Sequence, residues 1–380
     1  MPVAMQSRPD HPEISIVVPT LNEADGLERL FSTLEAQREV TLELVIADGG
    51  STDETVQRAR TLAASAPFAA KVIETGRGRG RQMNAGAAAA ASDTLLFLHA
   101  DSFFPDPLAL RSALDSLVRE IAAAKSGRGA GHFRLRFHRS TTGPSLPYYF
   151  YEWKARLHRP GCIHGDQGLL VTRDFFAEAG PFHESCPILE DVRLAGRIAE
   201  LGEWFLLPAE IVTSARRFEV EGLRERQTLN AIIMNFAALG DDALLEELPR
   251  LYATQDRTGR LAMGAALARI DGMIRGLTRG ERRRLWRETG RYVRANAWQI
   301  PFFLDVRRNF KRGAPVGQGE MPLLRLHDRI FDRLTDNRVG RGISMMLTRL
   351  WFRLSLVREP LTPPSARSPQ RSGSLPGRGR

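Results

Sequence analysis

Short apolar runs alternate with amphipathic segments along the first half of the chain. The runs are rich in Val, Ile and Leu, which is typical of strands buried on both faces of a sheet. In the segments between them, apolar residues recur at helical spacing. The predicted strands are residues 14–18, 42–47, 72–74 and 95–98, and the predicted helices are 27–34, one starting with the capping-box pattern of Ser51 and Glu54, 83–91 and 110–121. This order predicts a mostly parallel, Rossmann-like sheet with helices on both faces.

The pattern changes after residue 130. Residues 132–138 alternate between apolar and polar side chains, which predicts a half-buried strand in an antiparallel or edge position. A further strand is predicted at 168–172 and a helix at 192–201, ended by Gly202. From about Glu221 onward the chain reads as arginine-rich helices. The predicted fold class is therefore α/β, followed by a basic α-helical extension.

Four segments follow from these patterns. We expect an N-terminal tail at 1–12, the α/β domain at 13–255, the basic helical extension at 256–360 and a disordered tail at 361–380, where Pro, Ser, Gly and Arg predominate. Residues 241–380 contain 28 Lys+Arg and 14 Asp+Glu, whereas residues 1–240 contain 26 and 30. The basic half is thus expected to do different work from the front half.

The composition sets the class of protein. A chain of 380 residues with 43% hydrophobic and 26% charged residues is neither disordered as a whole, nor collagen-like, nor a disulfide scaffold. Its two cysteines, Cys162 and Cys186, favour a reducing compartment and buried thiols. The sequence has no apolar run of 18 residues and no signal-peptide core at its start. A cytoplasmic location is expected.

Candidate chemistry gathers where the predicted parallel strands end. Ligands of such sheets bind beyond the carboxyl ends of the strands. Polar, charged or glycine residues follow all four predicted strands, at 19–23, 48–51, 76–81 and 99–101. The arrangement predicts one cleft lined by carboxylates and arginines.

Each of these elements also has a plainer interpretation. Asp48 is either a turn residue or an acceptor for a base or ribose hydroxyl. The Gly-Arg run at 76–81 is either a solvated loop or a site where Arg79, Arg81 and the amides of the next helix bind a diphosphate. It is not a dinucleotide fingerprint, because Met83 replaces the third glycine, and no Gly-Lys-Ser/Thr follows to make it a P-loop.

The same choice applies to the acidic candidates. Asp101 either caps a turn or, beside a diphosphate, holds Mg²⁺ or Mn²⁺. Glu190 and Asp191 are either a charge pair at a helix N-terminus or include a general base. The turn at 164–168 is either only a turn or a contact for an acceptor.

Taken together, the motifs resemble family 2 glycosyltransferases with the GT-A fold. The resemblance covers roughly residues 13–255 and rests on residues 16–23, 47–53, 98–101 and 189–191. A finer pattern is similar to the bacterial subgroup associated with radical-SAM and seleno-domain proteins, some of them assigned to arsenosugar biosynthesis. Its residues are 78–84, 99–101, 165–168, 190–191 and 214–218.

The resemblance implies roles for single residues. The cofactor and donor pocket would comprise Thr20, Glu23, Asp48, Gly49, Arg79, Arg81 and Asn84; the acceptor site Gly165, Asp166, Gln167 and Arg216; the metal site Asp101 and His99; and the catalytic pair Asp191 and Glu190. Asp191 would be the base of an inverting transfer from a nucleoside-diphosphate sugar, most commonly a UDP-sugar in this family. His99 stands where most of the family has the first Asp of Asp-x-Asp, and imidazole suits Mn²⁺ better than Mg²⁺.

The basic C-terminal half leaves three interpretations open. It is an accessory helical subdomain, a basic amphipathic surface resting on anionic lipid at the inner face of the membrane, or a nucleic-acid-binding surface. The lipid interpretation would suit a lipid-linked acceptor rather than a small metabolite, and the nucleic-acid one is the least favoured. The alternatives for the whole chain are a nucleotidyltransferase and a binding protein without catalysis.

Overall fold

The computed structural model describes residues 11–185, 188–240, 245 and 259–359, and they form two compact units. The first contains residues up to 217 together with 297–334, and the second contains 218–296 and the residues from 335 onward. Residues 297–334, expected in the extension, thus belong to the unit that holds the sheet. The expected boundary at 255 and 256, the tail at 361–380 and Cys186 lie outside the described residues.

The first unit begins with alternating strands and helices. Its elements are β1 (Ile14–Thr20), η1 (Ala24–Gly26), α1 (Leu27–Glu35), β2 (Leu42–Asp48), α2 (Thr55–Ser65), β3 (Ala69–Glu74), α3 (Arg79–Ala89), β4 (Thr94–Phe97), β5 (Ser102–Phe103), α4 (Ala109–Ala123), β6 (Gly129–His138), α5 (Leu146–Lys154), η2 (Gly165–Gln167), β7 (Leu169–Thr172), α6 (Arg173–Ala179), α7 (Glu190–Leu201) and β8 (Glu203–Ser214). After the second unit's first segment come α13 (Gln299–Lys311), α14 (Pro322–Leu326) and η3 (His327–Phe331).

These strands form one eight-stranded sheet in the order β3-β2-β1-β4-β7-β6-β8-β5. β3, β2, β1 and β4 are parallel, β7 is antiparallel to both β4 and β6, β8 is parallel to β6, and β5 is antiparallel to β8. The predicted α/β fold class, a sheet that is parallel in its first part and is followed by a helical C-terminal part, is therefore confirmed.

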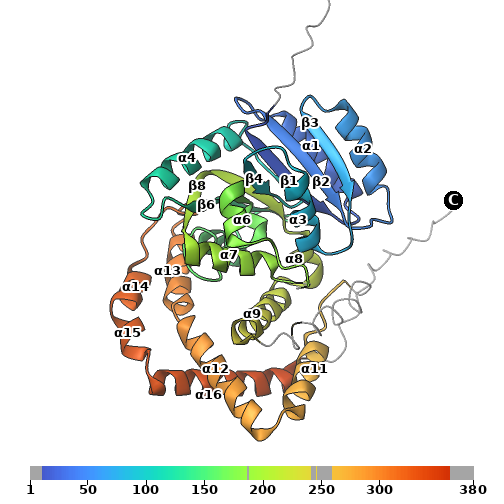
Figure 1. Cartoon of the computed structure of the whole chain (residues 1–380). Helices are drawn as coiled ribbons and strands as arrows, with labels where there is room; N and C mark the ends of the chain where they lie inside the picture. The colour runs from blue at the N-terminus through green and yellow to red at the C-terminus, as the bar shows by residue number, and fades with distance from the viewer. Residues whose placement is uncertain (1–10, 186–187, 241–244, 246–258, 360–380) are drawn as a thin grey trace, which may run out of the picture. The chain divides into compact units, whose positions relative to one another are not determined.

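Two apolar cores place helices on both faces of the sheet (Figure 1). Along β1, Ile14, Ile16 and Val18 pack with α1 and α4 on one face, whereas Val17 packs with α3 on the other face. The β-strand period of two assigns successive side chains to opposite cores. A third cluster joins α5 to α13 and α14 through Trp153, Cys162, Trp298, Phe302, Val306, Met321 and Leu324. Burial raises the pKa of the Cys162 thiol to about 11, as expected of a structural cysteine.

Two details of the sequence prediction need correction. The helix expected to start with a capping box at Ser51 begins at Thr55, because the carboxylate of Asp53 accepts the Thr55 N–H at 3.0 Å. The Ser51 hydroxyl instead donates to Asp48 at 2.5 Å. The strand at 132–138 is antiparallel to β7, as expected, but it lies inside the sheet between β7 and β8.

The β8 strand was not predicted from the sequence. Pro208 interrupts its apolar run, and such a residue is tolerated in a sheet at a bulge. The register shows one: between paired positions His132/Leu206 and Arg134/Glu210, β8 advances by more residues than β6. The extra length on β8 therefore carries Pro208 without breaking the sheet.

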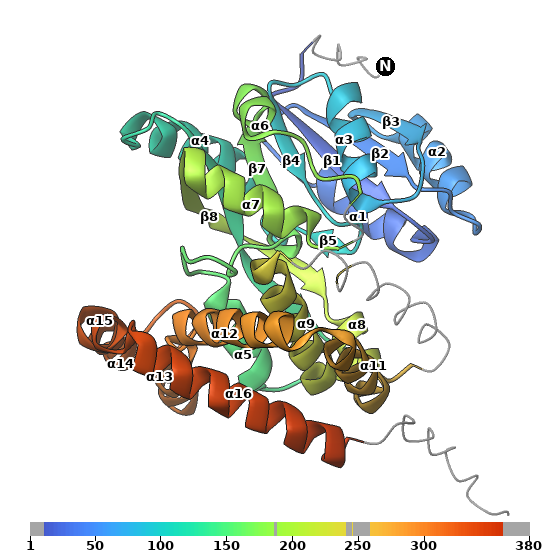
Figure 2. The same ribbon diagram turned by 60° about the horizontal axis from the view of Figure 1, so that its bottom comes forward.

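The second unit is helical. It contains α9 (Leu223–Leu239), α11 (Met263–Gly276), α12 (Arg279–Ala295) and α16 (Arg338–Arg358), while the short helices α8 (Arg216–Glu221) and α15 (Asp332–Thr335) lie at its borders with the first unit. α16 packs against α12 and α11, and Figure 2 shows it as one long helix beside α12. No described helix is long and apolar enough to cross a membrane.

Candidate functional site

The carboxyl ends of β1 and β2 are held together by a hydrogen-bond network around Asp48. Its carboxylate accepts from the hydroxyl of Thr20 at 3.1 Å and from the backbone N–H groups of Gly50 and Ser51 at 2.9 and 2.8 Å. With the Ser51 hydroxyl as a fourth donor, the acceptor capacity of the carboxylate is used. Asp48 is 1% exposed. In this structure Thr20 and Asp48 shape the floor of the site, and direct recognition of a base by Asp48 stays a prediction.

Gln82 of α3 completes this floor. Its side-chain N–H₂ donates to the carbonyls of Thr20 and Ala47 at 2.7 and 2.8 Å, so it joins α3 to both strand ends. A Cβ at Gly49 would lie 2.8 Å from the Gln82 side chain, which explains why glycine stands there. Gln82 lies in the motif at 78–84, but its role could not be predicted from the sequence, because only the packing of α3 shows that its amide is buried.

A cluster of charged groups lies where β4 ends and α7 begins. The Gly165 N–H donates to Oδ2 of Asp191 at 2.7 Å. A Cβ at Gly165 would lie 3.0 Å from Nε2 of His99 and 3.2 Å from Oδ2 of Asp191, so these three residues meet at one point. The predicted base and one predicted metal ligand are therefore neighbours.

The first turn of α7 is fixed by unusual backbone and charge contacts. Leu189, just before it, has a positive φ of 66°, uncommon for a residue with a bulky side chain. Glu190 is 1% exposed and accepts a charged hydrogen bond from Arg79 at 2.9 Å. Glu190 thus points to α3, while its neighbour Asp191 points to the Gly165 turn.

Electrostatics distinguish the two carboxyl groups of α7. Burial raises the pKa of Glu190, assisted by Asp191 and opposed by Arg79. Burial acts in the same direction on Asp191, but His164, Arg79 and the N–H groups of Gly165 and Val192 outweigh it and lower the pKa of Asp191. Asp191 is consequently an anion at neutral pH.

His99 is neutral at the same pH. Burial and the nearby Arg79 lower its pKa to about 4, although Asp101 and Asp191 oppose the shift. A neutral imidazole has a free lone pair and can bind a metal ion. Asp101 follows two residues later, and its Oδ1 accepts from the Thr213 hydroxyl at 3.4 Å.

Asp166 has an unsatisfied environment. Its Oδ1 is buried and has no hydrogen-bond partner among the residues that the structure describes. Burial, Asp191 and Asp101 raise the pKa of Asp166 to about 6, against the effect of His164. Tyr151 is nearby, since Asp166 and burial both raise its pKa. The next residue, Gln167, is 1% exposed and donates to the Cys162 carbonyl at 2.7 Å. A contact of Gln167 with an acceptor stays a prediction.

The two arginines of the Gly-Arg run contact different carboxylates. Arg79 pairs with Glu190, whereas Arg81 pairs with Glu184 at 3.3 Å. Asn84 donates to the carbonyl of Phe182 at 2.9 Å and to Glu184 at 3.0 Å, so it anchors the segment before α7. Arg79 therefore belongs to the charged cluster, while a diphosphate contact by Arg81 or Asn84 stays a prediction.

Glu23 and Arg216 form the outer part of the site. They pair at 3.6 Å. Burial raises the pKa of Glu23, and Asp101 adds to the shift while Arg216 opposes it. Arg217 lowers the pKa of His99 and of Glu23, so it also lies close to the cluster. His164 was expected here only as part of the turn at 164–168, and Arg217 only as part of the motif at 214–218.

The cluster can supply only part of a metal site. Among the described residues no group of three or more His, Cys, Asp and Glu side chains has the geometry to hold a metal ion. His99 and Asp101 nevertheless suit a divalent cation whose other ligands come from a diphosphate, because Mg²⁺ and Mn²⁺ are commonly bound by one or two protein ligands plus phosphate oxygens.

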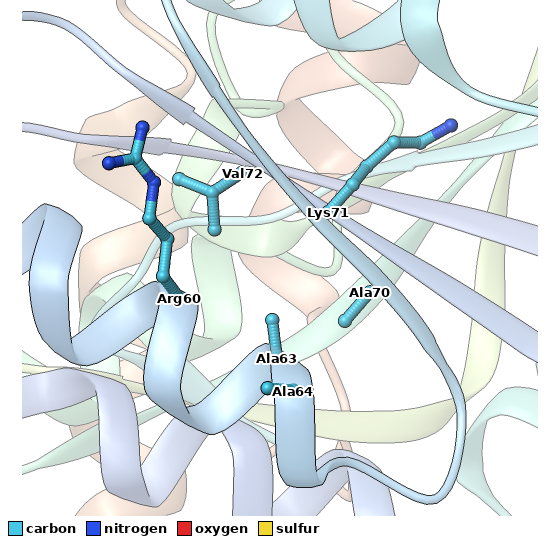
Figure 3. Close-up of a pocket in the computed structure, with 6 residues that line it drawn as sticks. All are labelled: Arg60, Ala63, Ala64, Ala70, Lys71 and Val72. Carbon is cyan, nitrogen blue, oxygen red and sulfur yellow. The ribbon is translucent and has the colours of Figure 1, made fainter.

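A separate depression lies between α2 and β3, lined by Arg60, Ala63, Ala64, Ala70, Lys71 and Val72 (Figure 3). Its two cations are already paired, Arg60 with Glu74 and Lys71 with Glu43. None of the cluster residues lines it, so it is not the candidate site.

Part of the chain is similar to known proteins. Residues 15–173 match the family model described as Glycosyl transferase family 2. An uncharacterized glycosyltransferase of Mycobacterium tuberculosis (strain H37Rv) is 35% identical over 107 residues, which are 28% of this chain and 40% of that protein. The chain thus matches two fifths of the length of this curated relative.

Two solved structures are also similar. The mannosyltransferase PcManGT from Pyrobaculum calidifontis, in complex with GDP-Man and Mn²⁺, has a TM-score of 0.46 and 18% identity, covering 94% of this chain and 91% of its own. TarS 1–349 of S. aureus, in complex with UDP-GlcNAc, has a TM-score of 0.45 and 15% identity, covering 80% and 92%. Likeness at this level assigns no ligand. Residues 15–173, which contain the strands from β1 to β7, are thus similar in sequence to family 2 glycosyl transferases.

Proposed function

We propose that this chain transfers a sugar from a nucleoside-diphosphate donor to a hydroxyl acceptor, with inversion at the anomeric carbon. The observation that carries the proposal is the meeting of Asp191, His99 and Gly165 beside the strand ends of a glycosyl transferase family 2 domain. A UDP-sugar is the first donor to test. The motif at 78–84 and the turn at 165–168 support membership of the radical-SAM-associated subgroup.

Asp191 acts as the general base. Its lowered pKa keeps it ionised, and the Gly165 N–H fixes its orientation. It takes the proton of the acceptor hydroxyl as that oxygen bonds to the anomeric carbon. The bond from this carbon to the diphosphate breaks through an oxocarbenium-like transition state, and the nucleoside diphosphate leaves with the electron pair.

The remaining residues position the donor. Asp101 and the neutral His99 would hold a divalent cation, which when bound would neutralise charge on the leaving diphosphate. Arg79 adds positive charge near the same point, and Glu190 fixes Arg79 by their ion pair, so Glu190 is a positioning residue. Thr20, Asp48 and Gly49 shape the pocket floor, and Glu23 and Arg216 form its rim.

The acceptor site lies at the turn that contains Gly165 and Asp166. The buried and unpartnered Oδ1 of Asp166 is suited to accept a hydrogen bond from a hydroxyl group. A lipid-linked acceptor and a small metabolite both offer such a group.

The proposal is tested by binding and by product analysis. A nucleoside diphosphate that binds the native state and not the unfolded state raises the melting temperature of the protein. We expect this rise to require Mn²⁺ or Mg²⁺. The panel includes UDP and GDP with their sugars. When donor and acceptor are both present and react, release of a nucleoside diphosphate supports the proposal. Consumption of a nucleoside triphosphate with release of pyrophosphate would indicate a nucleotidyltransferase instead. If neither a nucleoside diphosphate nor pyrophosphate were released, the chain would be a binding protein.

A further inference from the structure

Helix α16 is apolar on two opposite faces. On one face Phe352 is buried and packs against Trp286 of α12. The other face carries apolar residues at 339, 343, 346, 347, 350, 354 and 357, which follow helical spacing and form one stripe. We call these seven residues the α16 stripe.

The α16 stripe is exposed along its whole length. The exposed fractions are 70% for Val339, 54% for Ile343, 66% for Met346, 61% for Leu347, 54% for Leu350, 43% for Leu354 and 86% for Val357. Single exposed apolar residues are ordinary, but a continuous stripe of seven marks a surface that binds something.

The charge of α16 indicates the kind of partner. The helix contains five arginines and no acidic residue. Placed at 100° per residue, Arg349 and Arg353 flank one side of the α16 stripe and Arg358 the other. Arg349 lies over the ring of Trp286, and among the described residues no carboxylate pairs with Arg353 or Arg358. The stripe is therefore bordered by uncompensated positive charge.

We propose that the α16 stripe is an in-plane docking surface for an anionic lipid bilayer. A helix with an apolar face and flanking arginines binds the boundary between headgroups and acyl chains. The arginines attract the negative surface of the membrane, and their long stems let the charge stay in the headgroup layer. α16 lies on the surface rather than across it, because it is not apolar enough to span.

Two other occupants fit less well. A second copy of the chain, paired face to face through α16, would bring two arginine-bearing helices together without acidic residues to neutralise them. A nucleic acid would meet the arginines but leave the seven apolar side chains in contact with phosphates and water. An anionic bilayer satisfies both the stripe and its charged borders.

Vesicle co-sedimentation of the full chain tests the proposal. Phosphatidylcholine vesicles with and without phosphatidylglycerol are compared at low and high salt. We expect binding that requires phosphatidylglycerol and weakens with salt. The double variant Leu347→Gln/Leu350→Gln should bind at least tenfold more weakly, because a tenfold change corresponds to about 1.4 kcal/mol, less than the burial of one leucine contributes.

Matched variants separate the contributions. Leu108→Gln/Val118→Gln alters two exposed apolar residues at α4 in the other unit and should bind vesicles like the wild type. Arg353→Gln/Arg358→Gln should lose about tenfold at low salt and much less at high salt. Circular dichroism and thermal melting establish that each variant is folded.

The proposal is overturned by three results. One is the absence of binding to phosphatidylglycerol vesicles at low salt. Another is unchanged binding of the folded Leu347→Gln/Leu350→Gln variant. The third is a wild-type dimer in sedimentation velocity that the Leu347→Gln/Leu350→Gln variant does not form, together with no binding of the wild type to vesicles. This result would assign the α16 stripe to a second copy of the chain. Since none of these measures sugar transfer, they are independent of the proposed activity.

Discussion

The backbone N–H of Gly165 donates a hydrogen bond to Oδ2 of Asp191 at 2.7 Å. This contact joins the turn before β7 to the first turn of α7, and it orients the carboxylate toward His99. Because a Cβ at position 165 would lie 3.0 Å from His99 Nε2, the close approach requires glycine. The base of the proposed transfer is thus oriented by a backbone group, which a side-chain substitution elsewhere cannot easily remove.

Asp191→Asn should abolish most of the turnover. The amide keeps the size of the carboxylate but cannot accept the acceptor's proton, and a positioned base is typically worth about 10²–10⁴-fold in rate. Steady-state kinetics would show a lower kcat, while calorimetry would show nearly unchanged nucleoside-diphosphate affinity. The control Asp174→Asn alters an exposed carboxylate at the start of α6. If Asp191→Asn turned over at the wild-type rate, another group would be the base.

Asp101→Ala should weaken nucleoside-diphosphate binding only when a divalent cation is present. Its carboxylate and the imidazole of His99 are the proposed protein ligands of a divalent cation, which would take its other ligands from the diphosphate. Titration calorimetry with UDP, with Mn²⁺ and with a chelator, measures the difference. Asp25→Ala, whose side chain is 97% exposed, serves as the control and should leave both affinities unchanged. Equal affinities of Asp101→Ala and the wild type in both conditions would remove Asp101 from the site.

Gln82→Leu should destabilise the first unit by about 2 kcal/mol. The change removes the side-chain donor that the carbonyls of Thr20 and Ala47 share, although the Gly49 N–H still donates to Thr20 at 3.0 Å. A buried group that loses its partner costs about 1–3 kcal/mol. Urea unfolding measures the loss. Gln57→Leu, an exposed position on α2, makes the same chemical change at the surface and should cost much less. Equal losses for the two variants would mean that the Gln82 contacts contribute nothing.

Asp166→Asn should stabilise the fold above about pH 6. The folded carboxyl has a pKa of about 6, raised from 3.8, so at pH 5 the folded state holds a proton that the unfolded state has lost. Wild-type stability therefore falls as pH rises from about 4 to 6, and the variant lacks this fall. Above pH 6 the free energy of unfolding of Asp166→Asn should exceed that of the wild type by roughly 1–2 kcal/mol. This value is smaller than the full pKa shift would give, because the side chain is only partly buried and solvent screens it.

Thermal melting of wild type and Asp166→Asn between pH 4 and 7 tests this expectation. Asp25→Asn, at an exposed position, provides the matched substitution. Parallel pH profiles for all three proteins would mean that Asp166 titrates normally.

Hydrophobic periodicity predicted β1, β2, β4, α1 and α4 because such elements depend on local side-chain pattern. The rule that ligands bind at the carboxyl ends of parallel strands also indicated where His99 and Asp101 lie. The same rule gave no role to Gln82. The local pattern did not predict β8, because the bulge in β8 that accommodates Pro208 appears only when β8 pairs with β6.

The sequence by itself determined the order of β1 to β4 and α1 to α4, the residues at the ends of these strands and the basic character of the C-terminal helices. Each of these features depends on residues close together in the chain. Only the tertiary structure decided that Arg79 pairs with Glu190, 111 positions away, that Asp191 faces Gly165, and that residues 297–334 pack with the sheet unit. These contacts depend on how whole elements pack against each other. Burial then lowers the pKa of His99 and raises that of Asp166, whereas His164, Arg79 and backbone N–H groups outweigh burial at Asp191 and lower its pKa.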